Sequence, residues 1–475
     1  MATLTSQELD ALADRVAGRL RQPRERTVAP PAAGPSYHAS HAGVFDDMDA
    51  AVAAARAGHE FLVEASLAQR KTLIAALRAK THELAVEISA AAVRETGLGR
   101  AADKVTKNLL CADKTPGPEI LEPWTRSGDD GLAITERAPF GVIGSITPST
   151  NPTETIINNA ISMLSGGNGV VFNVHPSAQG VSRRFIEGLN AALIAAGGPA
   201  GLIACIAEPT IESAQALMQH PGVRLICVTG GPAVVKAAMR SGKRAIAAGP
   251  GNPPALVDET ADLAQAARDL VAGASLDNNI VCIVEKEIFA VESIASRLKA
   301  LMLEQGAVEV RGPALARLER LVVSDDGHPV RDFVGKDAAF IAKAAGLACP
   351  ANARLLLAEV DEDHPFVQAE LLMPVIPLVR VRSWEAGLEA AIRAEHGFGH
   401  TATMHSQNLR ALSEMAKRIN TSIFVKNGPS FAGLGLGGEG YTSFTIASPT
   451  GEGLTTARTF TRERRCTLKD SFRFV

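Results

Sequence analysis

The chain has 475 residues, which at about 150 residues per domain predicts two or three domains. Its 48 basic and 51 acidic residues give a formal net charge of −3, so it has no general electrostatic attraction for nucleic acid or for an anionic membrane surface. Hydrophobic residues make up 46% of the sequence but aromatic residues only 4%, so mainly Ala, Val, Leu and Ile must fill the core.

Residues 1–20 predict a short amphipathic helix, because apolar side chains recur at spacings of three and four from Leu9 to Leu20. Residues 21–40 contain four prolines among Ala, Gly and Ser, and we expect an extended linker there. Such a helix is marginal alone in water, so its apolar face implies a partner; the alternative is that it folds back on its own domain or frays. The chain shows neither a signal peptide nor a run of about 18 apolar residues, so we expect a cytosolic protein.

The middle of the chain alternates strand patterns with helix patterns. A helical pattern extends from Phe45 to about Ala92, and short apolar runs bounded by Gly or Pro begin after Pro139. We predict strands at 139–148, 170–174, 202–207 and 224–229, and helices at 152–165, 182–197, 212–220 and 233–241. A strand about every 25–30 residues with a helix between predicts an α/β fold with a parallel, doubly wound sheet.

Three predicted loops are candidate ligand sites, because parallel sheets bind ligands beyond the C-terminal ends of their strands. They consist of Thr147, Pro148, Ser149 and Thr150, then His175, Pro176 and Ser177, then Thr229, Gly230 and Gly231. The two glycines let a ligand approach the backbone at a helix N-terminus. A GxGxxG pattern at 433–438 does not open a βαβ unit, and we interpret it as a flexible loop rather than a phosphate site.

Cys282 is the candidate nucleophile among six cysteines, which form no Cys-x-x-Cys pair and predict neither a disulfide framework nor a zinc ribbon. Polar residues 277–279 precede Cys282 and a strand-like segment follows, which predicts a thiol at the edge of an element. A cysteine between Val and Ile is also typical of a small core residue, and Cys205 and Cys227 fit that interpretation better still.

Seven motifs carry a resemblance over residues 40 to 450. They are ITPSTNPTET (146–155), NGVVFNVHPSA (168–178), VTGG (228–231), GPGNPP (249–254), the Cys282 segment, ELLMPVIP (370–377) and GHTATMHS (399–406). In this order they resemble the aldehyde dehydrogenase superfamily, and specifically its CoA-acylating branch, the propionaldehyde and acetaldehyde dehydrogenases of bacterial microcompartments.

The resemblance implies a domain plan. Residues 41–251 are expected to form a Rossmann-like NAD-binding domain that includes an oligomerisation hairpin at 132–140, and residues 252–449 an α/β catalytic domain. Residues 450–475 are expected to form a β oligomerisation tail, which suits a homodimer or homotetramer. Residues 1–20 resemble an encapsulation peptide that docks an enzyme onto a microcompartment shell protein.

The resemblance also implies site residues. The Cys282 thiolate attacks the aldehyde carbonyl, and the Cys282 backbone N–H and the Asn151 side chain are the candidate donors to the oxyanion. Strict alignment places the oxyanion residue at Thr150, and Asn151 could instead cap the following helix. Glu370 is expected to accept hydrogen bonds from the nicotinamide ribose, and Gly251 and Pro374 are further expected NAD contacts.

A missing base favours CoA as the acyl acceptor. Hydrolytic relatives carry a water-activating glutamate where this chain has Ala248. A thioester on Cys282 then lacks a base for hydrolysis, whereas a thiol ionises more readily than water. The choice of NAD over NADP rests on the resemblance, because Ala178 replaces an acidic residue of the hydrolytic relatives. We predict no metal at His396, His400 or His405, where a structural or pocket-lining role is favoured.

The sequence therefore predicts CoA-dependent oxidation of a short aldehyde, propionaldehyde before acetaldehyde, inside a microcompartment. Alternatives are a hydrolytic aldehyde dehydrogenase or an acyl-phosphate reductase on the same fold. A non-catalytic scaffold or nucleotide-binding component is the alternative from another class.

Overall fold

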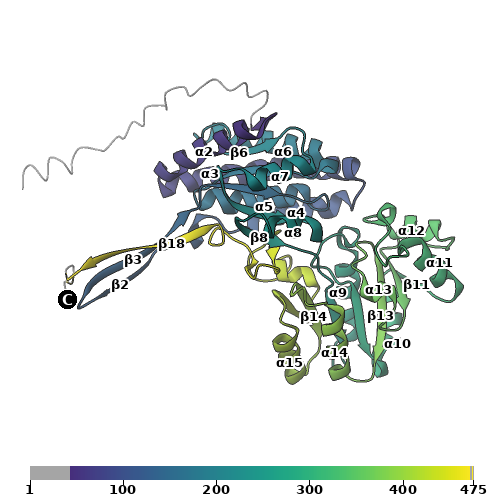
Figure 1. The fold of residues 1–475 in the computed structure, drawn as a ribbon. Coiled ribbons are helices and arrows are strands. Elements are labelled where there is room, and N and C mark those ends of the chain that lie inside the picture. Colours follow the sequence, from purple (N-terminus) through teal and green to yellow (C-terminus); the bar gives the residue numbers. More distant parts are fainter. Residues whose placement is uncertain (1–42, 471–472, 474–475) are drawn as a thin grey trace, which may run out of the picture. The chain divides into compact units, whose positions relative to one another are not determined.

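The structure, a computed structural model, describes residues 43–470 and 473. The predicted helix at 1–20 and the predicted linker at 21–40 lie outside the described residues. Two parallel sheets and one small antiparallel sheet organise the described chain (Figure 1). No helix of the described residues is long and apolar enough to cross a membrane.

The first sheet has six parallel strands in the order β1-β6-β5-β4-β7-β8. Its strands are β1 (Val44–Phe45), β4 (Val142–Ile146), β5 (Gly169–Asn173), β6 (Ile203–Ile206), β7 (Val223–Thr229) and β8 (Arg244–Ala248). The helices of this half are α2 (Met48–Glu64), α3 (Leu67–Thr96), α4 (Ala101–Lys114), α5 (Pro152–Ser165), α6 (Gln179–Ala195), α7 (Ile211–Gln219) and α8 (Pro232–Met239). The alternation of β and α segments predicted from the sequence is confirmed here.

The second sheet has seven parallel strands in the order β11-β12-β13-β10-β9-β14-β15. Its strands are β9 (Pro254–Val257), β10 (Glu287–Val291), β11 (Ala307–Val310), β12 (Leu355–Glu359), β13 (Val375–Val381), β14 (Thr401–His405) and β15 (Ile423–Lys426). Its helices are α9 (Leu263–Ser275), α10 (Glu292–Glu304), α11 (Pro313–Val322), α12 (Ala338–Ala344), α13 (Pro365–Gln368), α14 (Trp384–Ala394) and α15 (Leu409–Ile419).

The third sheet is antiparallel, in the order β18-β3-β2. Strand β3 (Gly131–Pro139) pairs with β2 (Trp124–Gly128) on one side and with the nine residues of β18 (Thr461–Lys469) on the other. The segment predicted as a hairpin at 132–140 is thus mostly one strand, and the turn of the hairpin precedes it. The two-stranded pair of β16 (Ile446–Ala447) and β17 (Gly453–Leu454) completes the described strands.

Helix α5 is buried along its whole length. It begins at Pro152, which suits the first turn because its missing N–H would have no helical partner there. Ile156, Ile157 and Ile161 pack in the largest hydrophobic cluster, which also includes Phe172 of β5. Because α5 cannot shift without opening this core, the loop 147–151 that precedes it is held firmly.

Candidate active site

Four adjacent strands of the second sheet collect the candidate catalytic residues at one edge. Gly251 precedes β9, Cys282 precedes β10, Glu370 precedes β13 and His400 precedes β14. Parallel strands that are neighbours in a sheet begin at the same edge, so residues far apart in sequence meet there. We call Gly251, Cys282, Lys286, Glu370 and His400 the thiol pocket. The segment 249–253 joins the C-terminal end of β8 to the N-terminal end of β9, so it also reaches the nucleotide-binding edge of the first sheet.

Cys282 is partly buried in a turn between η3, a 3-10 turn (Leu276–Asn279), and β10. The pKa of its thiol is raised to about 12, mainly by burial and then by the Glu370 carboxylate, and the Lys286 ammonium limits this increase. The resting group is therefore a protonated thiol. Reaction requires a proton acceptor or an added positive charge near Sγ.

Lys286 is the buried cation of the thiol pocket. Its Nζ donates to the backbone oxygen and to Oδ1 of Asn279, each at 2.7 Å. Burial lowers its pKa, while Glu370 is the largest of the influences that raise it. Since Lys286 also lowers the pKa of Cys282 and of His400, one charge favours a thiolate and a neutral imidazole together.

His400 and the backbone of Cys282 both lie close to Gly251. A Cβ added at Gly251 would lie 2.9 Å from His400 Cγ and 3.1 Å from the Cys282 carbonyl oxygen, so only glycine fits between them. His400 is buried, its Nδ1 contacts Thr401 Oγ1 at 2.9 Å, and its Nε2 has no hydrogen-bond partner among the described residues. Burial lowers its pKa to about 4, so the ring is neutral and Nε2 can accept a proton.

Glu370 is half-buried at the same edge. Burial raises the pKa of its carboxyl to about 7, and Lys286 and the Gly251 backbone N–H limit this increase. Pro374, another predicted cofactor contact, is buried, and its carbonyl oxygen accepts from the Leu356 N–H at 2.9 Å. Glu370 therefore belongs to the thiol pocket, whereas the backbone of Pro374 belongs to the sheet.

Asn151 occupies the N-cap position of α5, but its side chain makes no capping hydrogen bond. Its Oδ1 instead accepts a hydrogen bond from Lys107 Nζ, and its Nδ2 donates to Thr150 Oγ1 at 3.3 Å. The amide therefore keeps a second N–H that can serve as an oxyanion donor. The capping alternative is not what the side chain does in this structure.

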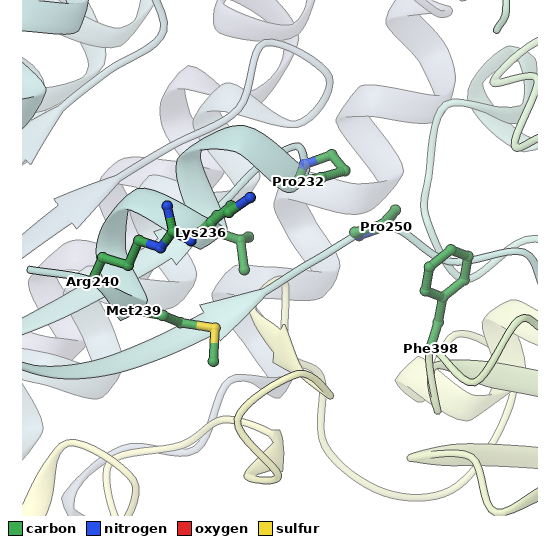
Figure 2. A pocket seen from close by; sticks show the side chains of 7 residues that line it. Pro232, Lys236, Met239, Arg240, Pro250 and Phe398 are labelled. Atoms are coloured by element: carbon green, nitrogen blue, oxygen red, sulfur yellow. The ribbon is translucent and has the colours of Figure 1, made fainter.

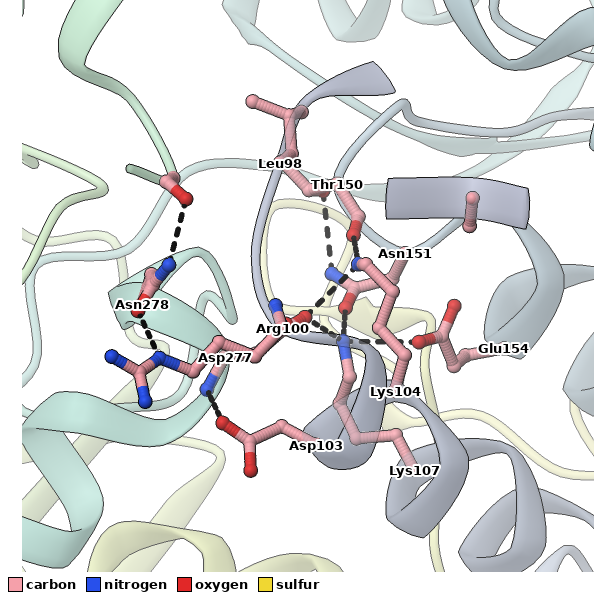
Figure 3. A network of polar contacts seen from close by, with 12 residues as sticks. Leu98, Arg100, Asp103, Lys104, Lys107, Thr150, Asn151, Glu154, Asp277 and Asn278 are labelled. Atoms are coloured by element: carbon pink, nitrogen blue, oxygen red, sulfur yellow. Dashed lines mark hydrogen bonds and ion pairs between the residues drawn. The ribbon is translucent and has the colours of Figure 1, made fainter. Parts of the chain in front are cut away.

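Two buried lysines of α4 lie beside Asp277, and one of them, Lys107, also contacts Asn151 (Figure 3). Lys107 Nζ lies 2.5 Å from Asp277 Oδ2 and 3.0 Å from Glu154 Oε1, and Lys104 Nζ lies 3.0 Å from the same Asp277 oxygen. We call Lys104, Lys107, Asn151, Glu154 and Asp277 the α4 network. Neither lysine was predicted as a site residue. Their only signal in the sequence is a spacing of three, which puts them on one helix face.

The three predicted nucleotide loops follow β4, β5 and β7 of the first sheet, as expected for ligand loops of a parallel sheet. Thr147 is buried, and its Oγ1 has no hydrogen-bond partner among residues 43–470 and 473. In the second loop, Ser177 donates its hydroxyl and its backbone N–H to His175 Nδ1. Gly231 caps α8 with open space where a side chain would lie, so a ligand can reach this helix N-terminus.

A pocket of about 440 Å³ lies beside α8. Figure 2 shows Lys236, Met239 and Arg240 along this helix, with Pro250 and Phe398 across from them. The lining is almost wholly apolar, and it includes the side chains of Lys236 and Arg240, which end in cations. These residues fit a ligand that carries both rings and phosphates, as NAD and CoA do.

Ala248 is the last residue of β8 and is buried. Its carbonyl oxygen accepts from the Gly230 N–H at 3.2 Å, which joins the 249–253 segment to the third nucleotide loop. A methyl side chain at this position contributes no base to the site.

The nucleotide loops and the thiol pocket define a cysteine-dependent dehydrogenase. The chain belongs to the aldehyde dehydrogenase family, because the model of this family matches its residues 21–316. It is 50% identical to the acetylating acetaldehyde dehydrogenase EutE of Escherichia coli, over 93% of this chain and 95% of the relative.

Two similar proteins have solved structures, each with a TM-score of 0.89. The propionaldehyde dehydrogenase of Rhodopseudomonas palustris, with bound CoA and an acylated cysteine, is 48% identical over 90% of this chain and 98% of that one. A propionaldehyde dehydrogenase of the Clostridium phytofermentans fucose utilisation microcompartment is 46% identical over 90% of this chain and 99% of that one. It has been solved with a histidine and, separately, a cysteine replaced by alanine.

Proposed function

We propose that this chain oxidises a short aldehyde with NAD⁺ and CoA to acyl-CoA and NADH. One observation carries the proposal: the backbone of Cys282 and the neutral, buried His400 both lie close to Gly251, while position 248 lacks a carboxylate. A cysteine with a nearby base that accepts a thiol proton suits acyl transfer to CoA. A site without a glutamate at position 248 does not suit attack by water.

The first half-reaction uses Cys282 and Asn151. The Cys282 thiol first loses its proton to solvent, a step that the Lys286 charge favours. Sγ then attacks the carbonyl carbon as a thiolate, and the new oxyanion accepts hydrogen bonds from the Cys282 backbone N–H and from Asn151 Nδ2. NAD⁺ supplies the hydride acceptor when it is bound, with Glu370, Gly251 and the three loops as its proposed contacts. Loss of hydride from the former aldehyde carbon leaves a thioester on Sγ.

The second half-reaction uses His400. Nε2 accepts the proton of the CoA thiol, and the CoA sulfur attacks the thioester carbon. The same donors hold the second oxyanion until the bond to Cys282 Sγ breaks. The Cys282 thiolate then leaves, and the proton on His400 returns to solvent or to that sulfur.

The relatives support this use of His400. In the C. phytofermentans protein, the cysteine and the histidine chosen for replacement are separated by the same number of residues as Cys282 and His400. This equal spacing supports the pairing of His400 with the replaced histidine of that protein. Thr401 Oγ1, at 2.9 Å from Nδ1, fixes the ring so that Nε2 stays available.

Location and assembly are part of the proposal. The likeness to an enzyme of a microcompartment supports a place in such a compartment, with residues 1–20 docking to a shell protein. The antiparallel sheet of β2, β3 and β18 supports a homodimer or homotetramer, because all five residues of its edge strand β2 are exposed and can pair with another subunit. The proposed domain limits are 41–251, 252–449 and 450–475. In their support, the strands of the first sheet lie in the first range, those of the second sheet lie in the second range, and β18 lies in the third.

NADH formation from propionaldehyde and NAD⁺, with and without CoA, tests the function. We expect sustained turnover only with CoA in the wild type, and none in Cys282→Ala. Sustained turnover without CoA that releases free acid would instead establish the hydrolytic alternative. Dependence on inorganic phosphate would establish the acyl-phosphate alternative, and full turnover by Cys282→Ala would remove the cysteine mechanism.

A further inference from the structure

We propose that Lys107 is a positioning residue of the oxyanion site, acting through the side chain of Asn151. It sets the direction of the Asn151 amide and, through Asp277, joins this amide to the turn that presents Cys282. The inference rests on the proposed function, because it assumes that an oxyanion forms at the carbon attacked by Cys282.

The donor chemistry of lysine fixes the amide. A lysine ammonium has three N–H donors and no acceptor, so the Asn151 atom that faces it must be oxygen. Lys107 Nζ donates hydrogen bonds to Asn151 Oδ1 and Asp277 Oδ2, and it forms an ion pair with Glu154 Oε1 at 3.0 Å. Rotating the Asn151 amide by half a turn would place NH₂ against the ammonium. Lys107 therefore keeps Nδ2 directed away from α4 and available to a ligand.

Asp277 links Lys107 to the turn that precedes Cys282. Residues 277, 278 and 279 all have left-handed backbone conformations, with φ of 47°, 54° and 66°, which non-glycine residues rarely adopt. Asp277 accepts from Lys104, from Lys107 and from the Arg100 backbone N–H at 2.6 Å. Asn279 accepts from Lys286, which lies beyond Cys282 in the chain. The ions thus hold a strained turn that ends at Cys282, whose N–H is the other proposed oxyanion donor.

Stability alone is a poor reason to bury these charges. Side chains of Lys104, Lys107, Glu154 and Asp277 are each exposed by 1% or less. Buried ion pairs seldom stabilise a protein more than well-packed apolar residues of the same volume. The gain that remains is directional, because two hydrogen bonds from the Lys107 ammonium define where Asn151 and Asp277 lie relative to each other.

Lys104 supplies the matched control. It lies on the same face of α4, is equally buried and shares Asp277 Oδ2 with Lys107. It differs in its other partners, because Lys104 Nζ donates to the backbone oxygen of Thr150 at 2.8 Å, whereas Lys107 Nζ contacts the side chains of Asn151 and Glu154. Lys104→Met and Lys107→Met therefore remove the same charge from the same cluster, but only the second releases the Asn151 amide.

The test is the pre-steady-state burst of NADH on mixing enzyme and NAD⁺ with saturating propionaldehyde, before CoA is added. We expect Lys107→Met to lower the burst rate constant about 10²-fold, close to the loss from Asn151→Ala, because loss of one oxyanion donor costs about 10²–10³-fold. Lys104→Met should lower it less than about 10-fold. The double variant Lys107→Met/Asn151→Ala should be no slower than Asn151→Ala alone, since Lys107 acts through that side chain.

Three results would overturn the proposal: equal losses in the two lysine variants, additive losses in the double variant, or a normal burst in Lys107→Met. If Lys107→Met does not fold, Lys107→Gln replaces it, because a glutamine still donates one N–H to Asn151 Oδ1. That variant should then keep a burst within about 10-fold of wild type, and a loss as large as that of Asn151→Ala would count against the proposal. The burst precedes CoA entry, so failure of the CoA step in the wild type would show itself separately.

Discussion

The α4 network and the thiol pocket are both buried and both charged, but their polar atoms differ in how they are paired. In the network, Asp277 accepts three hydrogen bonds and Lys107 contacts three oxygens. In the thiol pocket, His400 Nε2 has no partner in the described part of the chain. In the α4 network the charged groups neutralise one another, although Glu154 Oε1 has an ion pair and no hydrogen bond, whereas the thiol pocket leaves His400 Nε2 available to a substrate.

This difference explains why the two regions are adjacent. A nucleophile and a base with unpaired atoms gain energy by collapsing onto each other or onto nearby carbonyls. The paired frame prevents that collapse, because it holds the turn before Cys282 and the loop before α5 at fixed positions. Preorganised donors then need no rearrangement when charge develops on the aldehyde oxygen.

Breaking the frame should give the largest effect. Asp277→Asn keeps the shape of the side chain but leaves the ammonium groups of Lys104 and Lys107 short of a negative partner in a buried site. We expect a loss of about 3–5 kcal/mol in the free energy of unfolding, the usual result of removing one member of a buried ion cluster. Urea denaturation followed by circular dichroism measures it.

The control for this change is an exposed ion pair. Glu83 lies 2.7 Å from Lys80 and its side chain is 62% exposed. Glu83→Gln should change stability by less than about 1 kcal/mol. Equal losses in Asp277→Asn and Glu83→Gln would mean that water or backbone rearrangement compensates the buried lysines, and that the network is not a rigid frame.

Removing the base should give the next effect, and it should be confined to one half-reaction. His400→Gln keeps a polar side chain of similar length but provides no imidazole to accept the CoA proton. We expect CoA-dependent release of the acyl group to slow about 10²-fold or more, the usual contribution of a general base. The first equivalent of NADH per subunit should still form at a normal rate, so a burst followed by slow turnover is the expected trace.

A different outcome would reassign His400. If the burst and the CoA step slow equally in His400→Gln, the histidine shapes the pocket around Gly251 rather than accepting a proton. Mass spectrometry of the quenched enzyme distinguishes the cases, because loss of the base alone should leave an acyl group on Cys282.

The comparison also shows what the sequence could predict. Short apolar runs bounded by Gly and Pro identified β4 to β7 and α5 to α8, because those patterns reflect burial on both faces of a parallel sheet. Helix α4 was not predicted. Its buried side carries two lysines, so its sequence has the charge pattern of a solvated helix.

The site was predictable only in part, for a reason of topology. The motifs named Cys282, Asn151 and Glu370 as candidates, whereas His400 was interpreted as structural or pocket-lining. What joins His400 to Cys282 is the strand order β13-β10-β9-β14, which depends on long-range pairing and has no local sequence pattern. The partners of Asn151 were hidden for the same reason, because α4 and the 277–279 turn are distant in sequence.

The smallest predicted effect concerns the pH dependence of stability. It tests whether an unpaired buried histidine always belongs to a functional site. His405 lies at the other end of β14 from His400, is buried, and its Nε2 likewise has no partner among the described residues. Burial lowers the pKa of each histidine from 6.5 to about 4. Between these values the unfolded chain binds protons that the folded chain does not, so the free energy of unfolding falls as the pH falls from 6.5 towards 4.

In His405→Gln, unfolding should be coupled to the uptake of one proton instead of two, and the thiol pocket should be unchanged. We expect the loss of stability between pH 7.5 and pH 5.0 to be about 2 kcal/mol smaller in the variant than in the wild type, since 1.36 kcal/mol per pH unit acts over about 1.5 units. Urea midpoints at the two pH values measure the difference, with the exposed His328→Gln as a control. The CoA-dependent step of His405→Gln should proceed at the wild-type rate. A slower CoA-dependent step would show that His405 Nε2 also takes part in catalysis and that the thiol pocket extends along the whole of β14.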